Sequence, residues 1–564
     1  MANTADRSGV TYRGTATRTS AAGTSVTLIL AILAAAFCSG SLLCAFALRA
    51  DLLPLVLVVL AAGFFWLFRR VAVVSDTAPL AGYEWAFLGY AALIAVLRQM
   101  LYTDEYLTGH LVDAITTDDP WHFQEVASLV TTAHFPPRLN YQPDAYLHYY
   151  YLAWLPAAAA SGLLKLIGLG PAIKATYALD AGLIGIAFAF AFILFQRHVL
   201  PPPARKFAII ALFVAGAVPD GAAALYAAWK HHALVDVEWW QGAFWSGNQF
   251  SSVTSLFLWV PQHLAAVVAV LFAVMLVTEP RTLKPKDAPL AYLAAGLLLG
   301  FALFSSLFVV LGGFVALSPL LLRVLRERPR QLLPGLAVAA LLALPLLYIY
   351  RNTGSGEGPA LGIVYRYWRD MHHGSAFWGV VGIGVVAFEM ILEVGWLPLY
   401  AYALAGQKFL KSPLGAVAVA STLFLLSTAV VSFPVSHNYA MRGSLIPMIL
   451  LVYGFAWAAS ENPRGLTAPR WGAVAKVAFA AVIGLAVVGN LNVAVVYGAE
   501  GIRALRPSET AACQEQIIAL NRGTSQTVAY PSACRAKNSP YAMEQPFVKA
   551  QLDLKDLALR GKGP

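Results

Sequence analysis

Apolar runs of about 20 residues recur along most of this chain, and a run of that length crosses the hydrocarbon core of a bilayer as a helix. Only helices and closed barrels satisfy all of their backbone hydrogen bonds in lipid. The sequence therefore predicts an all-α polytopic membrane protein of roughly 12–14 spans. The candidate spans cover residues 25–49, 52–74, 82–102, 146–168, 172–195, 207–227, 257–278, 289–303, 305–322, 331–350, 377–404, 412–433, 443–460 and 471–496.

Charged residues are few and lie mainly between the apolar runs. They make up 12% of the chain, whereas a soluble domain carries about a quarter. Lys and Arg gather in short loops, as the positive-inside rule expects, so the net charge of +10 does not indicate a nucleic-acid partner. The sequence contains no Walker loop and no dinucleotide fingerprint, which argues against ATP-driven transport and against a nucleotide cofactor.

The distribution of Lys and Arg orients the spans. Arg69 and Arg70 close the second span and, with the basic N-terminus, place that end of the chain in the cytoplasm. Segment 103–145 then lies outside. Segment 197–206 also has cytoplasmic character, although counting spans from segment 103–145 puts it outside. One element between residues 103 and 206 must therefore be re-entrant, split or wrongly counted.

This orientation divides the chain into three parts. We expect a disordered cytoplasmic N-terminus over 1–24, a transmembrane domain over 25–497 and a small extracytoplasmic tail over 498–564. Cys513 and Cys534 lie in the tail, where an oxidising compartment would permit a disulfide. Long connections in a compact protein are usually functional or disordered, and the long external ones besides the tail are 103–145, 228–256 and 351–376.

Ionisable residues gather in the first external segment. Asp104 and Glu105 end the third span, and Asp118 and Asp119 open the stretch DDPWHFQEVASLV. Either Asp118 or Asp119, followed by Pro120, makes a good helix N-cap. Capping needs only one carboxylate, however, and does not explain the accompanying imidazoles of His110, His122, His134 and His148. We therefore expect a functional acid pair, and favour Asp118–Asp119 over Asp104–Glu105.

This stretch resembles the first extracytoplasmic loop of GT-C glycosyltransferases, and is most similar to the branch of protein O-mannosyltransferases and lipid A aminoarabinose transferases. The matching positions are Asp118, Asp119, Phe123, Ala127 and Val130, followed by HFPP and HYYYLAWLP. The close match is confined to this loop and the start of the next span. The chain departs from the branch in having two spans before the one that leads into the loop, and in having Asp as the second acid.

The resemblance implies a GT-C-like helix bundle with extracytoplasmic juxtamembrane helices, in a bacterial inner (plasma) membrane. It implies transfer of a sugar from a polyprenyl-phosphate-linked donor to an extracytoplasmic lipid, glycan or protein acceptor. Asp118 would be the catalytic acid/base or the activator of the acceptor, with Asp119 as its partner. Two close acids can raise the pKa of one of them or bind a divalent metal ion, and the sequence leaves both roles open.

Three later segments carry candidate substrate-binding residues. Trp239 and Trp240 are of a type that stacks on sugars, although an aromatic belt at the interface would look the same. His263 lies at the mouth of a span, where an ionisable residue is a functional candidate. Arg366 and Arg369 could hold the donor phosphate. The remaining candidates are His122, His148, His437 and Arg442, and a structural salt bridge would explain Arg442 as well as a lipid phosphate does.

The main alternative is a polytopic transporter or lipid flippase of the cell envelope. Such a protein would place ionisable groups within its spans and would show paired, Gly/Pro-interrupted halves. In this sequence the ionisable groups cluster outside the spans and no halves repeat, which favours the enzyme. A non-catalytic subunit that retains the fold is a third interpretation, because fold does not imply function.

Overall fold

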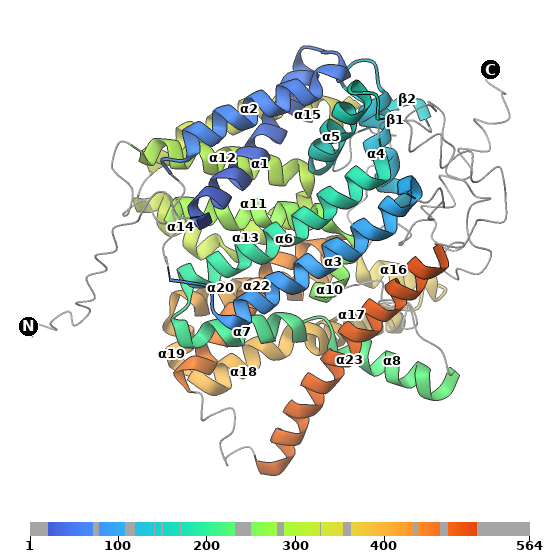
Figure 1. Cartoon of the computed structure of the whole chain (residues 1–564). Helices are drawn as coiled ribbons and strands as arrows, with labels where there is room; N and C mark the ends of the chain where they lie inside the picture. The colour runs from blue at the N-terminus through green and yellow to red at the C-terminus, as the bar shows by residue number, and fades with distance from the viewer. Residues whose placement is uncertain are drawn as a thin grey trace, which may run out of the picture.

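The computed structural model of the protein is a bundle of helices that run side by side (Figure 1). Short helices and two two-stranded antiparallel ribbons are added to the bundle. The structure describes residues 21–71, 78–107, 119–139, 142–147, 151–169, 172–231, 250–278, 287–327, 329–352, 362–432, 438–462 and 472–504.

The described part of the chain begins with a helical hairpin and ends with its longest helix. The helices are α1 (Ala21–Ala45), η1 (Ala50–Leu52), α2 (Leu53–Phe68), α3 (Gly82–Leu107), α4 (Asp119–Thr131), η2 (Tyr151–Trp154), α5 (Leu155–Leu166), α6 (Ile173–Val199), α7 (Pro202–Val214), α8 (Val218–His231), α10 (Val253–Trp259), α11 (Pro261–Thr278), α12 (Ala288–Ser305), α13 (Leu307–Ala316), α14 (Ser318–Glu327), α15 (Pro329–Asn352), α16 (Val364–Met371), α17 (Ala376–Met390), the π-helical turn η3 (Ile391–Gly395), α18 (Trp396–Ala405), α19 (Gln407–Lys411), α20 (Pro413–Thr428), α21 (Asn438–Gly443), α22 (Leu445–Glu461) and α23 (Gly472–Ala504). Strands β1 (Arg138–Leu139) and β2 (Gln142–Tyr146) pair with each other, as do β3 (Gly362–Ile363) and β4 (Val431–Ser432).

The predicted class is confirmed: this is an all-α polytopic membrane protein. In the described residues, 7 helices are long and apolar enough to cross a membrane, and up to 9 if two bent helix pairs each count as one span. The bends are 44° between α7 and α8 and 71° between α13 and α14. Two shorter apolar helices lie at Pro413–Thr428 and Leu445–Glu461, and Ala480–Val496 is an apolar part of α23. Of the predicted spans, 305–322 folds as the bent pair α13–α14.

Helix α5 explains why the span count failed between residues 103 and 206. The predicted span 146–168 folds as η2 followed by α5, which has only 12 residues. A helix of that length rises about 18 Å, well short of the roughly 30 Å hydrocarbon core. In Figure 1, α5 lies beside α4 near the same end of the bundle at which α6 begins. Among the described residues, α6 is long and apolar enough to cross a membrane, and α5 is not.

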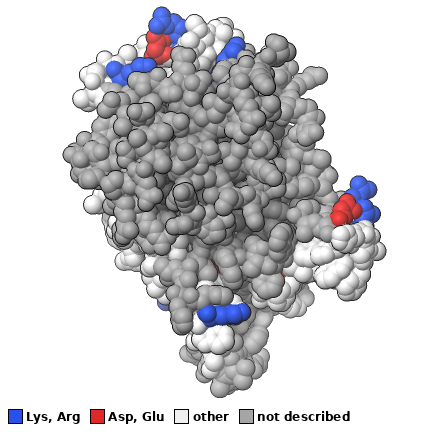
Figure 2. Space-filling view, turned by 90° about the vertical axis from the view of Figure 1, so that its right-hand side faces the viewer, with Lys and Arg blue, Asp and Glu red and all other residues white. Residues whose placement is uncertain are grey.

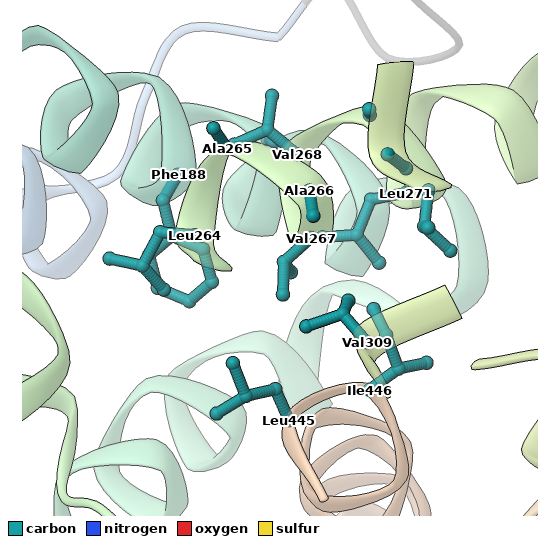
Figure 3. Packing of buried hydrophobic residues seen from close by; sticks show 14 of the residues in the cluster. Phe188, Leu264, Ala265, Ala266, Val267, Val268, Leu271, Val309, Leu445 and Ile446 are labelled. Carbon is teal, nitrogen blue, oxygen red and sulfur yellow. The ribbon is translucent and has the colours of Figure 1, made fainter. Parts of the chain in front are cut away.

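The core is centred on α11, whose side chains are buried nearly all round the helix. A helix that is apolar on all faces is expected inside a bundle rather than at its surface. Figure 3 shows α11 residues such as Val267 and Leu271 packed toward Val309 of α13 and Ile446 of α22. Because α11 is fixed on all sides, its first residues, which include His263, are held firmly at one end of the core.

Helices α8 and α23 touch along small residues, and we expect this contact to be intolerant of a methyl group. A Cβ on Gly221 would lie 1.8 Å from the carbonyl oxygen of Leu485. We expect Gly221→Ala to lower the free energy of unfolding by about 1–3 kcal/mol through overpacking, measured as a fall in melting temperature in detergent. Gly484→Ala, at a position of α23 with no atom within 4 Å of the added Cβ, is the control and should not lower it. Equal losses in both variants would contradict this packing.

One end of the bundle gathers elements that lie within or next to the first predicted external segment, 103–145. Figure 1 shows the end of α3, all of α4 and the start of α6 toward the upper right. Figure 2 turns that side of the molecule to the viewer, and the described Lys, Arg, Asp and Glu visible there lie near its margin. The chain after α4 is tied to the turn between α1 and α2, because Phe135 N donates to Leu48 O at 2.8 Å and Ala50 N donates to Ala133 O at 3.0 Å.

Candidate functional site

Helix α4 begins at the predicted acid pair and packs into the bundle. It starts at Asp119, which agrees with the expectation that the Asp–Asp–Pro sequence opens a helix. Val126, Ala127 and Leu129 are fully buried, so the apolar side of this helix contacts the core. Asp118 lies outside the described residues. The structure therefore fixes the helix that the acid pair begins, and the role of the pair stays a prediction.

His122 and Glu125 form a buried pair on α4. His122 Nδ1 lies 2.8 Å from Glu125 Oε2, and the two side chains are only 3% and 1% exposed. Residues three apart share a helix face, and this face turns toward aromatic side chains of the bundle. The His122 ring centroid lies 5.1 Å from that of Trp154 in η2 and 6.0 Å from that of Tyr177 in α6. Trp154 and Tyr177 are themselves 4.9 Å apart, so the three rings form one cluster.

Arg98 of α3 makes a hydrogen bond that holds Tyr177 of this cluster in place. Its two terminal nitrogens donate to the carbonyl oxygen of Leu258 at 2.6 Å and to the hydroxyl of Tyr177 at 2.7 Å. The guanidinium also lies 5.1 Å from the centre of the Tyr177 ring, within the range of a cation–π contact. Lys174, one turn before Tyr177 on α6, is 2% exposed. Two buried cations thus accompany the aromatic cluster.

Two further predicted residues complete the site. His263, near the start of α11, is fully buried, and Arg442 of α21 is 9% exposed. Arg442 and His122 both lie close enough to His263 to interact with it electrostatically. The structure therefore brings together His122, His263 and Arg442, which the sequence took from three segments far apart along the chain. We define the His122 cluster as Arg98, His122, Glu125, Trp154, Lys174, Tyr177, His263 and Arg442.

Sequence reasoning had not assigned a role to five members of this cluster. Arg98 and Lys174 were counted inside predicted spans, yet an ionisable residue in a span is itself a signal of function. Trp154 and Tyr177 were hidden among the many aromatic residues of the apolar runs. Glu125 lies in the stretch that Asp118 opens, and its i, i+3 spacing from His122 was the signal that could have paired the two.

Other predicted residues lie elsewhere or outside the described chain. Arg366 and Arg369 belong to α16, which packs against α17, and Arg369 pairs with its neighbour Asp370 at 2.7 Å on the surface. The role of Arg366 and Arg369 in holding a phosphate stays a prediction. Asp104 and Glu105 lie at the end of α3. The predictions that fall outside the described residues are those for Asp118, His148, Trp239, Trp240 and His437, and the same holds for the side chain of Asp119.

The chemistry open to the His122 cluster follows from its composition. Within the described ranges no group of three or more His, Cys, Asp or Glu is arranged to hold a metal ion, and whether Asp118 and Asp119 bind a metal ion stays open. Arg and Lys supply charged hydrogen-bond donors suited to a phosphate or carboxylate. The buried His–Glu pair supplies a group that can accept a proton. The site can therefore hold an anion and exchange a proton in an apolar setting.

No protein-family model matches the chain, and no curated protein matches it.

Proposed function

We propose that this protein is a membrane glycosyltransferase of GT-C type. It moves a sugar from a polyprenyl-phosphate-linked donor to an extracytoplasmic lipid, glycan or protein acceptor, and it lies in a bacterial inner membrane. One observation carries the proposal: buried cations and imidazoles meet at the end of an apolar bundle, directly against the helix that the acid pair opens. The resemblance of that helix and its flanks to the GT-C loop supports it independently.

The chemistry of a lipid-phosphate donor matches this arrangement. Breaking the bond between the sugar and its phosphate leaves negative charge on the departing phosphate, which fixed positive groups stabilise best where water is excluded. Arg442 is the candidate for this role, because it lies on a short helix close enough to His263 to interact with it electrostatically. Asp118 and Asp119 remain the candidates for binding the acceptor or a divalent metal ion.

The proposal is tested by profiling lipid-linked sugars and glycoconjugates in cells. Cells would carry the wild type, a deletion, Asp118→Asn or Asp119→Asn, with matched amounts of protein in the membrane. We expect the deletion and Asp118→Asn to lose one sugar from a glycoconjugate and to accumulate a polyprenyl-phosphate sugar. Asp370→Asn, at an exposed acid of α16, is the control and should match the wild type. A deletion strain with unchanged glycans and lipid-linked sugars would end the proposal.

A transporter or flippase is the second candidate, and one observation favours it. The structure buries carboxylates within the helices of the bundle, contrary to the expectation that ionisable groups lie outside the spans: Asp180, Asp220, Glu389 and Glu393 are all less than 9% exposed. Intramembrane acids often mark ion or substrate pathways, and the π-helical turn that carries Glu393 is of a kind frequent at functional sites. If Glu393→Gln abolished function and Asp118→Asn did not, this candidate would take precedence.

A further inference from the structure

The buried pair on α4 suggests a proton-transfer role that the sequence had not assigned. We infer that His122 accepts the proton of the incoming acceptor hydroxyl, and that Glu125 is a positioning residue that orients the His122 ring. The inference rests on the proposed glycosyl transfer and deepens it, because it defines the acceptor as a hydroxyl compound and names the group that activates it. It moves acceptor activation from Asp118 to His122.

The contact with Glu125 fixes which ring nitrogen of His122 is available. A carboxylate only accepts hydrogen bonds, so the bond of 2.8 Å between Glu125 Oε2 and His122 Nδ1 places the imidazole proton on Nδ1. Nε2 then carries the lone pair. A carboxylate behind the ring also stabilises the imidazolium that forms when Nε2 takes up a proton, as in other His–carboxylate pairs.

The rings around His122 hold it in one orientation. Trp154 and Tyr177 pack against it from one side, with ring centroids 5.1 and 6.0 Å from that of His122 and 4.9 Å from each other. Tyr177 is in turn fixed by the hydrogen bond from Arg98. A proton acceptor works best when it is held rigidly by packed neighbours.

One buried atom on each of the neighbouring His122 and Trp154 rings indicates what His122 is able to bind. Among the described residues, His122 Nε2 and Trp154 Nε1 are both buried and have no hydrogen-bond partner. The first accepts a hydrogen bond and the second only donates one. A hydroxyl group does both, since it has one proton to donate and lone pairs that accept. The two atoms are therefore complementary to a substrate hydroxyl, and a buried polar atom without a partner is costly enough to call for an explanation.

Each bond that forms in the proposed transfer is matched by one that breaks. His122 Nε2 takes the proton of the acceptor hydroxyl while the hydroxyl oxygen forms a bond to the anomeric carbon of the donor sugar. The bond between that carbon and the phosphate oxygen breaks, and the polyprenyl phosphate leaves with the electron pair. The proton on Nε2 then passes to water or to the departing phosphate, which restores neutral His122 beside the Glu125 carboxylate.

The test separates proton transfer from donor binding and from folding. The variants are His122→Gln, Glu125→Gln and, as a matched control, His134→Gln at an exposed imidazole that follows α4. Purified protein is assayed for melting temperature and for binding of undecaprenyl phosphate, and cells carrying each variant are profiled for the sugar-bearing product. We expect His122→Gln to lower product formation about 100-fold or more while undecaprenyl phosphate still binds. Glu125→Gln should lower it less, and His134→Gln should leave it unchanged.

Chemical rescue distinguishes a proton acceptor from a packing residue. Membranes with His122→Ala should regain product formation from their endogenous substrates when imidazole is added, and membranes with Glu125→Ala should not. Normal product formation by His122→Gln would overturn the inference and leave the glycosyltransferase standing. Joint loss of melting temperature, binding and product in His122→Gln, with no rescue by imidazole, would show that the pair only attaches α4. If the wild type and the deletion strain gave the same products, the proposed function itself would fail.

Discussion

Arg197→Gln should reduce the free energy of unfolding by about 3–5 kcal/mol, because it leaves a buried carboxylate without its cation. Arg197 at the end of α6 donates through Nε to Glu84 Oε1 at 2.9 Å and through a second nitrogen to Glu84 Oε2. The two side chains are 5% and 1% exposed. Arg197 also donates to the carbonyl oxygens of Ala78 and Pro79 at 2.7 and 3.0 Å. The pair therefore fastens the start of α3 to the end of α6.

The measurement is thermal unfolding of purified protein in one detergent, with each variant at matched concentration. The double variant Glu84→Gln with Arg197→Gln should recover part of the loss, because it removes the buried charge together with its partner. Arg323→Gln is the control, because it breaks an ion pair on the surface: the side chains of Arg323 and Glu327 are 63% and 46% exposed. This variant should lower the free energy of unfolding by no more than about 1 kcal/mol. Equal losses from the buried and exposed pairs would show that burial does not set the strength of these contacts.

The sequence predicted the fold class because apolar length alone decides whether a helix crosses a membrane. It did not predict where an apolar run bends or stops short. The α7–α8 bend occurs at Gly216, whose φ of 73° is one that glycine adopts freely. The run of α5 is short because the preceding residues form η2 instead of extending the helix. These outcomes depend on tertiary contacts, which a hydropathy window does not contain.

The sequence predicted part of the His122 cluster. The residues that it did not predict were overlooked for one physical reason. His122, His263 and Arg442 stood out because each is an ionisable residue next to an apolar run. Arg98 and Lys174 did not stand out, because each lies within an apolar run that was predicted to be a span. Only the packing of α3 against α6 shows that Arg98 faces Tyr177 and so supports His122. A single sequence does not show which side chains of different helices are in contact.

Arg98→Gln should lower the free energy of unfolding by about 2–5 kcal/mol, because it leaves the Leu258 carbonyl and the Tyr177 hydroxyl without their donor. Both acceptors are deep in the bundle, so water does not readily replace the guanidinium. Arg98 joins three elements, since it lies on α3 and donates to α6 and to the last turn of α10. The loss should appear as a lower melting temperature in detergent, and Tyr177→Phe, which removes one of the two bonds, should cost about 1 kcal/mol.

Arg98→Lys separates the structural role of this residue from its role in the site. A Lys keeps the charge but lacks the planar fork that reaches two acceptors at once, so we expect a milder loss of melting temperature than in Arg98→Gln. Tyr177 would lose its fixed position beside His122, and product formation in cells should fall about 10-fold, the equivalent of one misplaced contact of about 1.4 kcal/mol. Tyr177→Phe should show a similar fall, and the double variant no more than either alone, because both act on the same bond. Additive losses in the double variant would show that Arg98 also acts on the site by a route other than Tyr177, such as its bond to the Leu258 carbonyl.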